Sequence, residues 1–118
     1  MSREPSSRVE LLQGTLDLLI LQTLLPGPSH GHAIAKHIQR TSEELLQVET
    51  GSLYPALHRL EVNGWIAPYW AVSDQGRRAR FYKLTASGRK QLAAEHSKWE
   101  KVSRAIGLIL NPANGKSS

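Results

Sequence analysis

The feature that most constrains the fold is the order of patterns across residues 48–88. Apolar residues first recur at the three- and four-residue spacing of a helix, at Val48, Leu53, Ala56, Leu57 and Leu60. This segment stops at Asn63-Gly64, and two strand-like runs follow, separated by the turn-forming segment Asp74-Gln75-Gly76-Arg77-Arg78. The order predicts a helix of about residues 50–63 that leads directly into a β-hairpin.

Basic charge is concentrated on this predicted hairpin. The chain carries 15 Lys and Arg against 10 Asp and Glu, which gives a formal net charge of +5. Six of the basic residues follow one another without an acidic residue between them: Arg77, Arg78, Arg80, Lys83, Arg89 and Lys90. A helix followed by a basic hairpin is typical of a winged helix that contacts DNA, so we expect double-stranded DNA as a partner. The alternative is a solvated basic face that has no partner.

Composition and motifs exclude several other classes. With 118 residues we expect one domain with one modest core, and the lack of cysteine excludes disulfides, thiolate zinc sites and thiol nucleophiles. The longest apolar run, Leu18 to Leu21, is far shorter than a membrane span, and no secretory signal is visible, so we expect a cytoplasmic protein without a membrane partner. The histidines form no metal-binding pattern, and neither a phosphate loop nor a nucleophile elbow is present. We therefore expect no metal, no cofactor and no catalytic residues.

Two further helices are expected before the hairpin. Leucines recur at helical spacing between Leu11 and Leu25, on more faces than one core can cover, which indicates a second partner surface on this helix. Ser29 is expected to cap a second helix that reaches about Arg40. The predicted fold is mainly α with a small β-hairpin, a winged helix-turn-helix over residues 11–84, with flexible segments at 1–10 and 111–118.

The third helix is the candidate recognition helix. Leu53, Ala56, Leu57 and Leu60 share the face expected to pack inward, which leaves the opposite face to meet a DNA groove. The predicted DNA-binding residues are Thr50, Gly51, Ser52, Tyr54, Pro55, His58 and Arg59 on the helix, and Arg77, Arg78 and Arg80 on the hairpin. For Thr50 and Ser52, simple helix capping is an equal alternative. The hairpin aromatics, Trp65, Trp70, Phe81 and Tyr82, are expected mostly to pack against the helices.

A long last helix is expected over residues 85–110, with Thr85 as its cap. Leu92, Trp99 and Ile106 are seven residues apart, and Val102 and Ile109 complete a seam in which Glu95 is the exception. Such a seam needs a partner, and we expect a second copy of the chain. The predicted dimer interface is Leu12, Leu16, Leu19, Leu92, Trp99, Val102, Ile106 and Ile109.

Several segments together resemble the PadR family of bacterial transcriptional regulators. They are Gly14-Thr15-Leu16, Gly31, Gly51-Ser52-Leu53-Tyr54-Pro55-Ala56-Leu57, Arg59-Leu60-Glu61, Gly64-Trp65-Ile66, Trp70, Gly76-Arg77-Arg78, Tyr82-Lys83-Leu84-Thr85 and Gly88. The resemblance covers about residues 11–110, and the single last helix is similar to the short-tailed subgroup. It implies a homodimeric repressor that binds a palindromic, inverted-repeat operator, with its third helix in the major groove.

The resemblance also implies a small-molecule effector, because several family members are relieved by small hydrophobic compounds bound between subunits. The pocket implied here is lined by Trp99 with Leu12, Leu16 and Val102. An aromatic residue on a dimer seam also fits plain packing, and that alternative stays open. A second alternative, from another functional class, is a winged-helix module that binds protein and not DNA.

Overall fold

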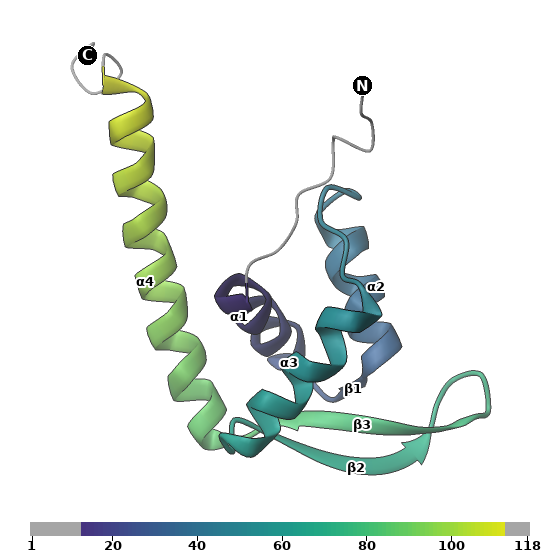
Figure 1. Cartoon of the computed structure of the whole chain (residues 1–118). Helices are drawn as coiled ribbons and strands as arrows, with labels where there is room; N and C mark the ends of the chain where they lie inside the picture. Colours follow the sequence, from purple (N-terminus) through teal and green to yellow (C-terminus); the bar gives the residue numbers. More distant parts are fainter. Residues whose placement is uncertain (1–12, 113–118) are drawn as a thin grey trace.

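The computed structural model describes residues 13–112, and its elements follow the predicted order (Figure 1). The elements are α1 (Gln13–Leu24), β1 (Ser29–His30), α2 (Gly31–Thr41), α3 (Thr50–Val62), β2 (Ile66–Val72), β3 (Arg78–Leu84) and α4 (Ala86–Leu110). Helices α1, α2 and α3 form a cluster, the hairpin of β2 and β3 extends from its base, and α4 rises along the other side (Figure 1). The predicted fold class, a mainly α winged helix-turn-helix, is confirmed.

The sheet contains one strand that the sequence patterns did not predict. Its order is β1-β3-β2 and both pairings are antiparallel, with Ser29 opposite Tyr82 and His30 opposite Phe81. Ser29 therefore lies in a strand, and the expectation that it caps α2 was wrong. The cap is His30, whose Nδ1 accepts a hydrogen bond of 3.3 Å from the backbone N–H of Ala33. Pro68 lies in β2, which is an edge strand of this sheet. Proline is tolerated there because no strand on the outer side needs its missing N–H.

The core lies where the three-helix cluster meets the sheet. Its most completely buried large side chains are Ile20, Leu21, Leu24, Ile34, Leu57, Leu60 and Ile66. The four α3 residues expected to face inward, Leu53, Ala56, Leu57 and Leu60, are all buried. Two residues predicted for the dimer interface, Leu16 and Leu92, are also in this core, with 3% and 6% of their surfaces exposed. These two side chains are therefore already covered within one chain, and the dimer interface stays a prediction.

Helix α4 begins at a tightly packed junction. Thr85 caps it as expected, because its Oγ1 accepts from the N–H of Gly88 at 2.9 Å and also donates to the carbonyl of Gly64 at 2.7 Å. Gly88 lies so close to the chain at Trp65 that a Cβ placed there would be 2.0 Å from the Trp65 carbonyl oxygen. The helix then leaves the cluster, and most of its second half is exposed (Figure 1). Leu12 and the segments 1–10 and 113–118 lie outside the described residues.

Candidate nucleic-acid interface

Helix α3 presents most of its predicted contact residues to solvent. Thr50, Gly51, Ser52, Tyr54, Pro55 and His58 are all exposed. The N-cap residue is Glu49, and its side chain makes no capping hydrogen bond, so neither Thr50 nor Ser52 is the cap that the alternative reading required. The first amide groups of α3 thus have no side-chain cap.

Arg59 is the exception on this helix. Its Nη2 lies 2.6 Å from Oδ1 of Asp17 on α1, and about a third of its side chain is exposed. The guanidinium thus ties α3 to α1, on the side turned away from the exposed face, and its Nε atom is buried without a hydrogen-bond partner among the described residues. The pair gives Arg59 a structural contact within the chain, and its contact with DNA stays a prediction.

We define the wing as residues 66–84, which comprise β2, β3 and the turn between them. Its tip is a tight turn. Gly76 has φ = +77°, a conformation that glycine adopts without strain, and its N–H donates to the Ser73 carbonyl at 2.9 Å. Arg77 and Arg78, which follow this turn, are exposed and form no ion pair within residues 13–112. Their charges are therefore available to a phosphate. Arg80, further along β3, is partly engaged, with Nη2 3.1 Å from Oε2 of Glu61.

A groove separates the wing from the helices, and we call it the wing groove. It encloses about 700 Å³ and is lined by His30, Gly31, His32, Tyr54, Trp70, Ser73, Gln75, Arg77, Arg78, Ala79, Arg80 and Tyr82. Gly31 lets α2 and α3 approach closely here, because a Cβ at this position would be 2.8 Å from the Tyr54 hydroxyl oxygen. The structure therefore brings Tyr54 of the recognition helix and the three wing arginines to one concave surface.

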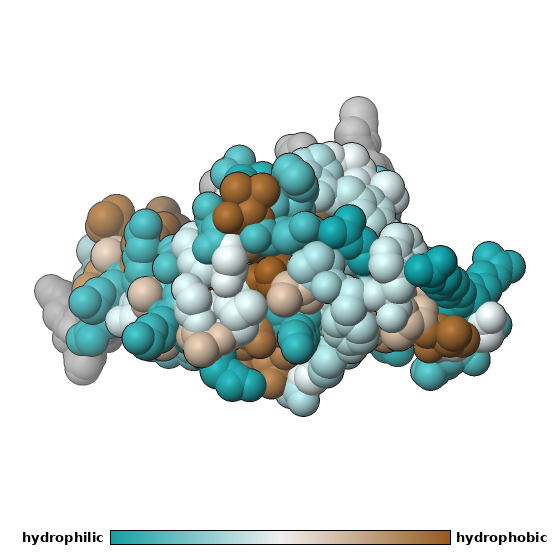
Figure 2. Space-filling model, turned by 90° about the horizontal axis from the view of Figure 1, so that it is seen from below, coloured by the Kyte–Doolittle hydropathy of each residue, from teal (hydrophilic) through white to brown (hydrophobic). Residues whose placement is uncertain are grey.

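Trp70 belongs to this surface, although it was expected to pack against the helices. More than half of its surface is exposed, and the guanidinium carbon of Arg78 lies 4.8 Å from its ring centre. Figure 2 shows the end of the wing, at the right, as mainly hydrophilic with a small hydrophobic patch among the polar residues. The signal in the sequence was the alternation along β2, which places Trp70 on the same side of the sheet as its pairing partner Arg80.

Trp65, just before the wing, and Phe81 and Tyr82 of the wing pack as expected. Tyr82 is buried, Trp65 and Phe81 are half-buried, and the rings of Phe81 and His30 meet edge to face with centres 5.2 Å apart. Burial raises the pKa of the Tyr82 phenol above its ordinary value of 10.0, and the nearby positive charge of Arg80 opposes this change. The base of the wing is therefore fixed to the helices, while its tip is open.

The apolar seam on α4 is exposed over its second half. Trp99, Val102 and Ile106 each expose about half of their surface, and Ile109 exposes 75%. Leu19, on α1, is half-buried. Of the predicted effector-pocket residues, Leu16 is buried in the core while Trp99 and Val102 are half-exposed, and the pocket stays a prediction.

Within residues 13–112, no group of three or more His, Cys, Asp or Glu side chains could hold a metal ion. No helix in the same range is both long and apolar enough to cross a membrane.

Comparison with known proteins gives one consistent family. The family model described as "Transcriptional regulator PadR-like family" matches residues 20–94. Transcriptional regulator Rv3488 of Mycobacterium tuberculosis is 31% identical over 97 residues, which cover 82% of this chain and 87% of the relative.

Solved structures agree with this match. A transcriptional regulator from Clostridium thermocellum is 33% identical and superimposes with a TM-score of 0.73, over 80% of this chain and 92% of that chain. A PadR family transcription regulator from Clostridium difficile is 29% identical with a TM-score of 0.70, over 80% of this chain and 97% of that chain.

Proposed function

This chain belongs to the transcriptional regulator PadR-like family, and on that premise we propose that it is a repressor that binds an inverted-repeat operator as a homodimer. The observation that carries the proposal is the wing groove. There, Tyr54 of α3 shares a concave surface with two arginines, Arg77 and Arg78, that no carboxylate neutralises within residues 13–112.

In this proposal, α3 and the wing contact different parts of the DNA. A helix N-terminus with small residues, here Gly51 and Ser52, can approach base edges and phosphates in the major groove. His58 is exposed further along the same helix and is our candidate for base recognition. The wing arginines then contact the backbone or the adjacent minor groove, so that affinity depends strongly on salt. Because it works on DNA, we place the protein in the bacterial cytoplasm.

The second copy would be held through α4. The exposed stripe of Trp99, Val102, Ile106 and Ile109 is too apolar to be left in water, and a matching stripe on another copy would cover it symmetrically. Two recognition helices related by a dyad then require half-sites about 10 bp apart, or a multiple of this spacing. An inverted repeat in the operator follows from that symmetry.

A small hydrophobic effector is a further part of the proposal. Trp99 and Val102 are exposed one helical turn apart, so an apolar compound could be held between the two copies at this level. Such a compound would weaken DNA binding only if it bound the free dimer more tightly than the DNA-bound dimer.

The test is a titration of the protein against the DNA upstream of its own gene, at two salt concentrations, with a scrambled duplex as competitor. Wild-type protein is expected to prefer its upstream duplex. Arg77→Gln with Arg78→Gln should weaken binding and make the slope of log affinity against log salt shallower by about 1.8, since each phosphate contact contributes about 0.9. Lys98→Gln with Lys101→Gln, which removes the same charge from exposed positions on α4, is the matched control and should change the slope little.

Three other results would contradict parts of this proposal. Equal, weak and salt-sensitive binding to both duplexes would refute sequence-specific regulation and favour the protein-binding module. Specific binding that the two arginine changes leave intact would refute the role of the wing. Loss of specificity in the α4 control would place the DNA contact elsewhere.

A further inference from the structure

Two large apolar side chains lie exposed on the wing, among its arginines. Trp70 exposes 58% of its surface and Val72 exposes 68%. Both belong to β2 and are two residues apart, so they project from the same side of this edge strand. Neighbouring exposed apolar side chains on an edge strand favour association with a partner. The pair is therefore a candidate contact surface.

The charges beside this pair indicate what kind of partner fits it. In the sheet, Trp70 lies opposite Arg80 and Val72 lies opposite Arg78. One side of the wing thus carries an apolar row on β2 and a cationic row on β3, and neither strand contains a carboxylate. Proteins that enter the minor groove of DNA combine the same two features, because the cations meet the negative potential of the groove while the apolar side chains meet the base pairs.

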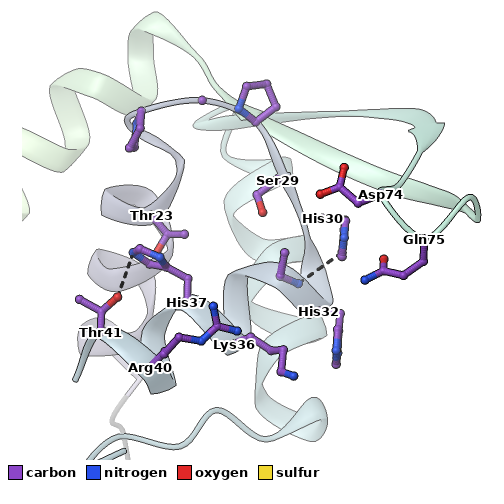
Figure 3. Close-up of a pocket in the computed structure, with 14 residues that line it drawn as sticks. Thr23, Ser29, His30, His32, Lys36, His37, Arg40, Thr41, Asp74 and Gln75 are labelled. Atoms are coloured by element: carbon purple, nitrogen blue, oxygen red, sulfur yellow. Dashed lines mark hydrogen bonds between the residues drawn. The ribbon is translucent and has the colours of Figure 1, made fainter. Parts of the chain in front are cut away.

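The base of the wing holds this surface in a defined position. On the other side of the sheet, the rings of Tyr69 and Phe81 have centres 5.8 Å apart, and the ring of Phe81 meets that of His30. The turn of the wing lies beside the start of α2, where Asp74 and Gln75 line one cavity with His30 (Figure 3). The apolar pair therefore projects from a hairpin whose place relative to α2 is set before DNA binds, which lowers the entropy cost of binding.

The spacing of the pair matches the stacking of base pairs. Two residues along a strand span about 7 Å, at roughly 3.4 Å per residue. Successive nucleotides of B-DNA rise by about 3.4 Å, so the same length covers two base-pair steps. The guanidinium carbon of Arg78 lies 4.8 Å from the ring centre of Trp70 and covers one face of the indole, while the exposed remainder of the ring is available to the DNA.

From this exposure, charge and spacing we infer that Trp70 enters the minor groove beside the α3 site and partly unstacks one base step, so that the protein bends its operator. Val72 packs against the neighbouring step. This inference rests on the proposed function, because it needs the operator duplex to lie against the wing. Side chains inserted in this way bend a duplex by about 20–90°. Since pyrimidine–purine steps unstack most easily, the wing favours a TA or CA step without hydrogen bonds to its bases.

The experiment measures bending and unstacking of the upstream duplex in solution. Energy transfer between dyes at its two ends reports the bend, and 2-aminopurine, placed in turn at positions flanking the α3 site, becomes brighter where a base is unstacked. Wild-type protein should bring the ends closer and brighten one step in each half-site. Trp70→Ala should lose both signals and bind on the order of tenfold more weakly, which is the size of one aromatic–base contact. Its salt slope should not change, because no charge is removed.

Two further variants separate insertion from other roles of Trp70. Arg78→Gln removes a charge from the same side of the wing and leaves the indole in place, so it should keep the bend while its salt slope becomes shallower by about 0.9. Trp70→Phe keeps an aromatic ring and should keep part of the bend. Because Trp70 is mostly exposed, Trp70→Ala should melt close to wild type without DNA, which shows that the wing still folds.

The remaining outcomes count against the inference. Wild-type protein that prefers its upstream duplex but neither bends nor unstacks it would overturn the inference and leave the proposed function standing. A bend that survives in Trp70→Ala would overturn it as well. In that case, a salt slope shallower by about 0.9 would show that Trp70 only positions Arg78, and altered sedimentation would show that the patch joins copies of the chain. If wild-type protein shows no preference between the upstream and scrambled duplexes, the proposed function fails and the inference fails with it.

Discussion

Replacing Gly88 by alanine tests how α4 is joined to the winged helix. The added Cβ would lie 2.0 Å from the carbonyl oxygen of Trp65 and 2.9 Å from Cδ1 of Leu84. Ordinary contact begins at 3.4 Å, so α4 and the Trp65 carbonyl must separate by about 1.4 Å, which is 3.4 less 2.0 Å. Two hydrogen bonds at the junction share this movement: Thr85 N–H to the Trp65 carbonyl at 3.1 Å, and Thr85 Oγ1 to the Gly64 carbonyl at 2.7 Å.

The expected cost follows from these contacts. Overpacking costs about 1–3 kcal/mol, and weakening the two hydrogen bonds costs about 1 kcal/mol each. Against this, alanine is more favourable than glycine in a helix by about 0.5–1 kcal/mol. The net loss in the free energy of unfolding is about 2–4 kcal/mol. For a chain of this size, that lowers Tm by on the order of 10 °C.

The assay is thermal unfolding followed by circular dichroism, without DNA. The matched control is Gly51→Ala, because Gly51 also lies in the first turn of a helix but has no atom within 4 Å of the added Cβ. The control should change stability by at most about 1 kcal/mol, in the stabilising direction. If Gly88→Ala melts within a degree or two of wild type, the close approach of α4 to Trp65 is wrong.

Three further predictions concern single contacts. Asp17→Ala should lower the free energy of unfolding by about 1–2 kcal/mol in urea titrations, because it leaves the half-buried guanidinium of Arg59 unpaired, and an unchanged midpoint would show that the pair is only a surface contact. Burial raises the folded-state pKa of Tyr82 above its unfolded value of 10.0, so its contribution to stability is complete below pH 10.0 and is lost as pH rises through the folded pKa; Tyr82→Phe should flatten that alkaline loss. Trp99→Ala with Ile106→Ala should yield a monomer in sedimentation, and a surviving dimer would move the interface away from the second half of α4.

The elements predicted well from sequence are those with a local signal. The α3 periodicity, the stop at Asn63-Gly64 and the Gly76 turn each act over a few neighbouring residues, and the structure reproduces them. Thr85 was also identified as the cap of α4, because capping is decided within one turn. The family likeness was carried by the same local segments.

The errors fall where distant residues decide the outcome. The β1 strand has only two residues, and it exists because β3 lies beside it, so no pattern within residues 29–30 could indicate it. The seven-residue spacing of α4 could not show that Leu92 is covered by its own chain while Trp99 is exposed. No local pattern could show either that Arg59, predicted to contact DNA, pairs with a residue 42 positions away in the sequence.

The same distant contacts explain how a dimer could position two recognition helices. Helix α1 packs against α2, α3 and α4, and the Asp17–Arg59 pair fixes α1 to α3. At the other end, Gly64 and Trp65 follow directly after α3, and Gly88 of α4 packs against Trp65. The direction of α4 is therefore fixed relative to α3 at two separate places. If two copies pair through α4, the distance between their α3 helices is set by these junctions, so a change at either should alter the preferred half-site spacing before it alters the bases that are read.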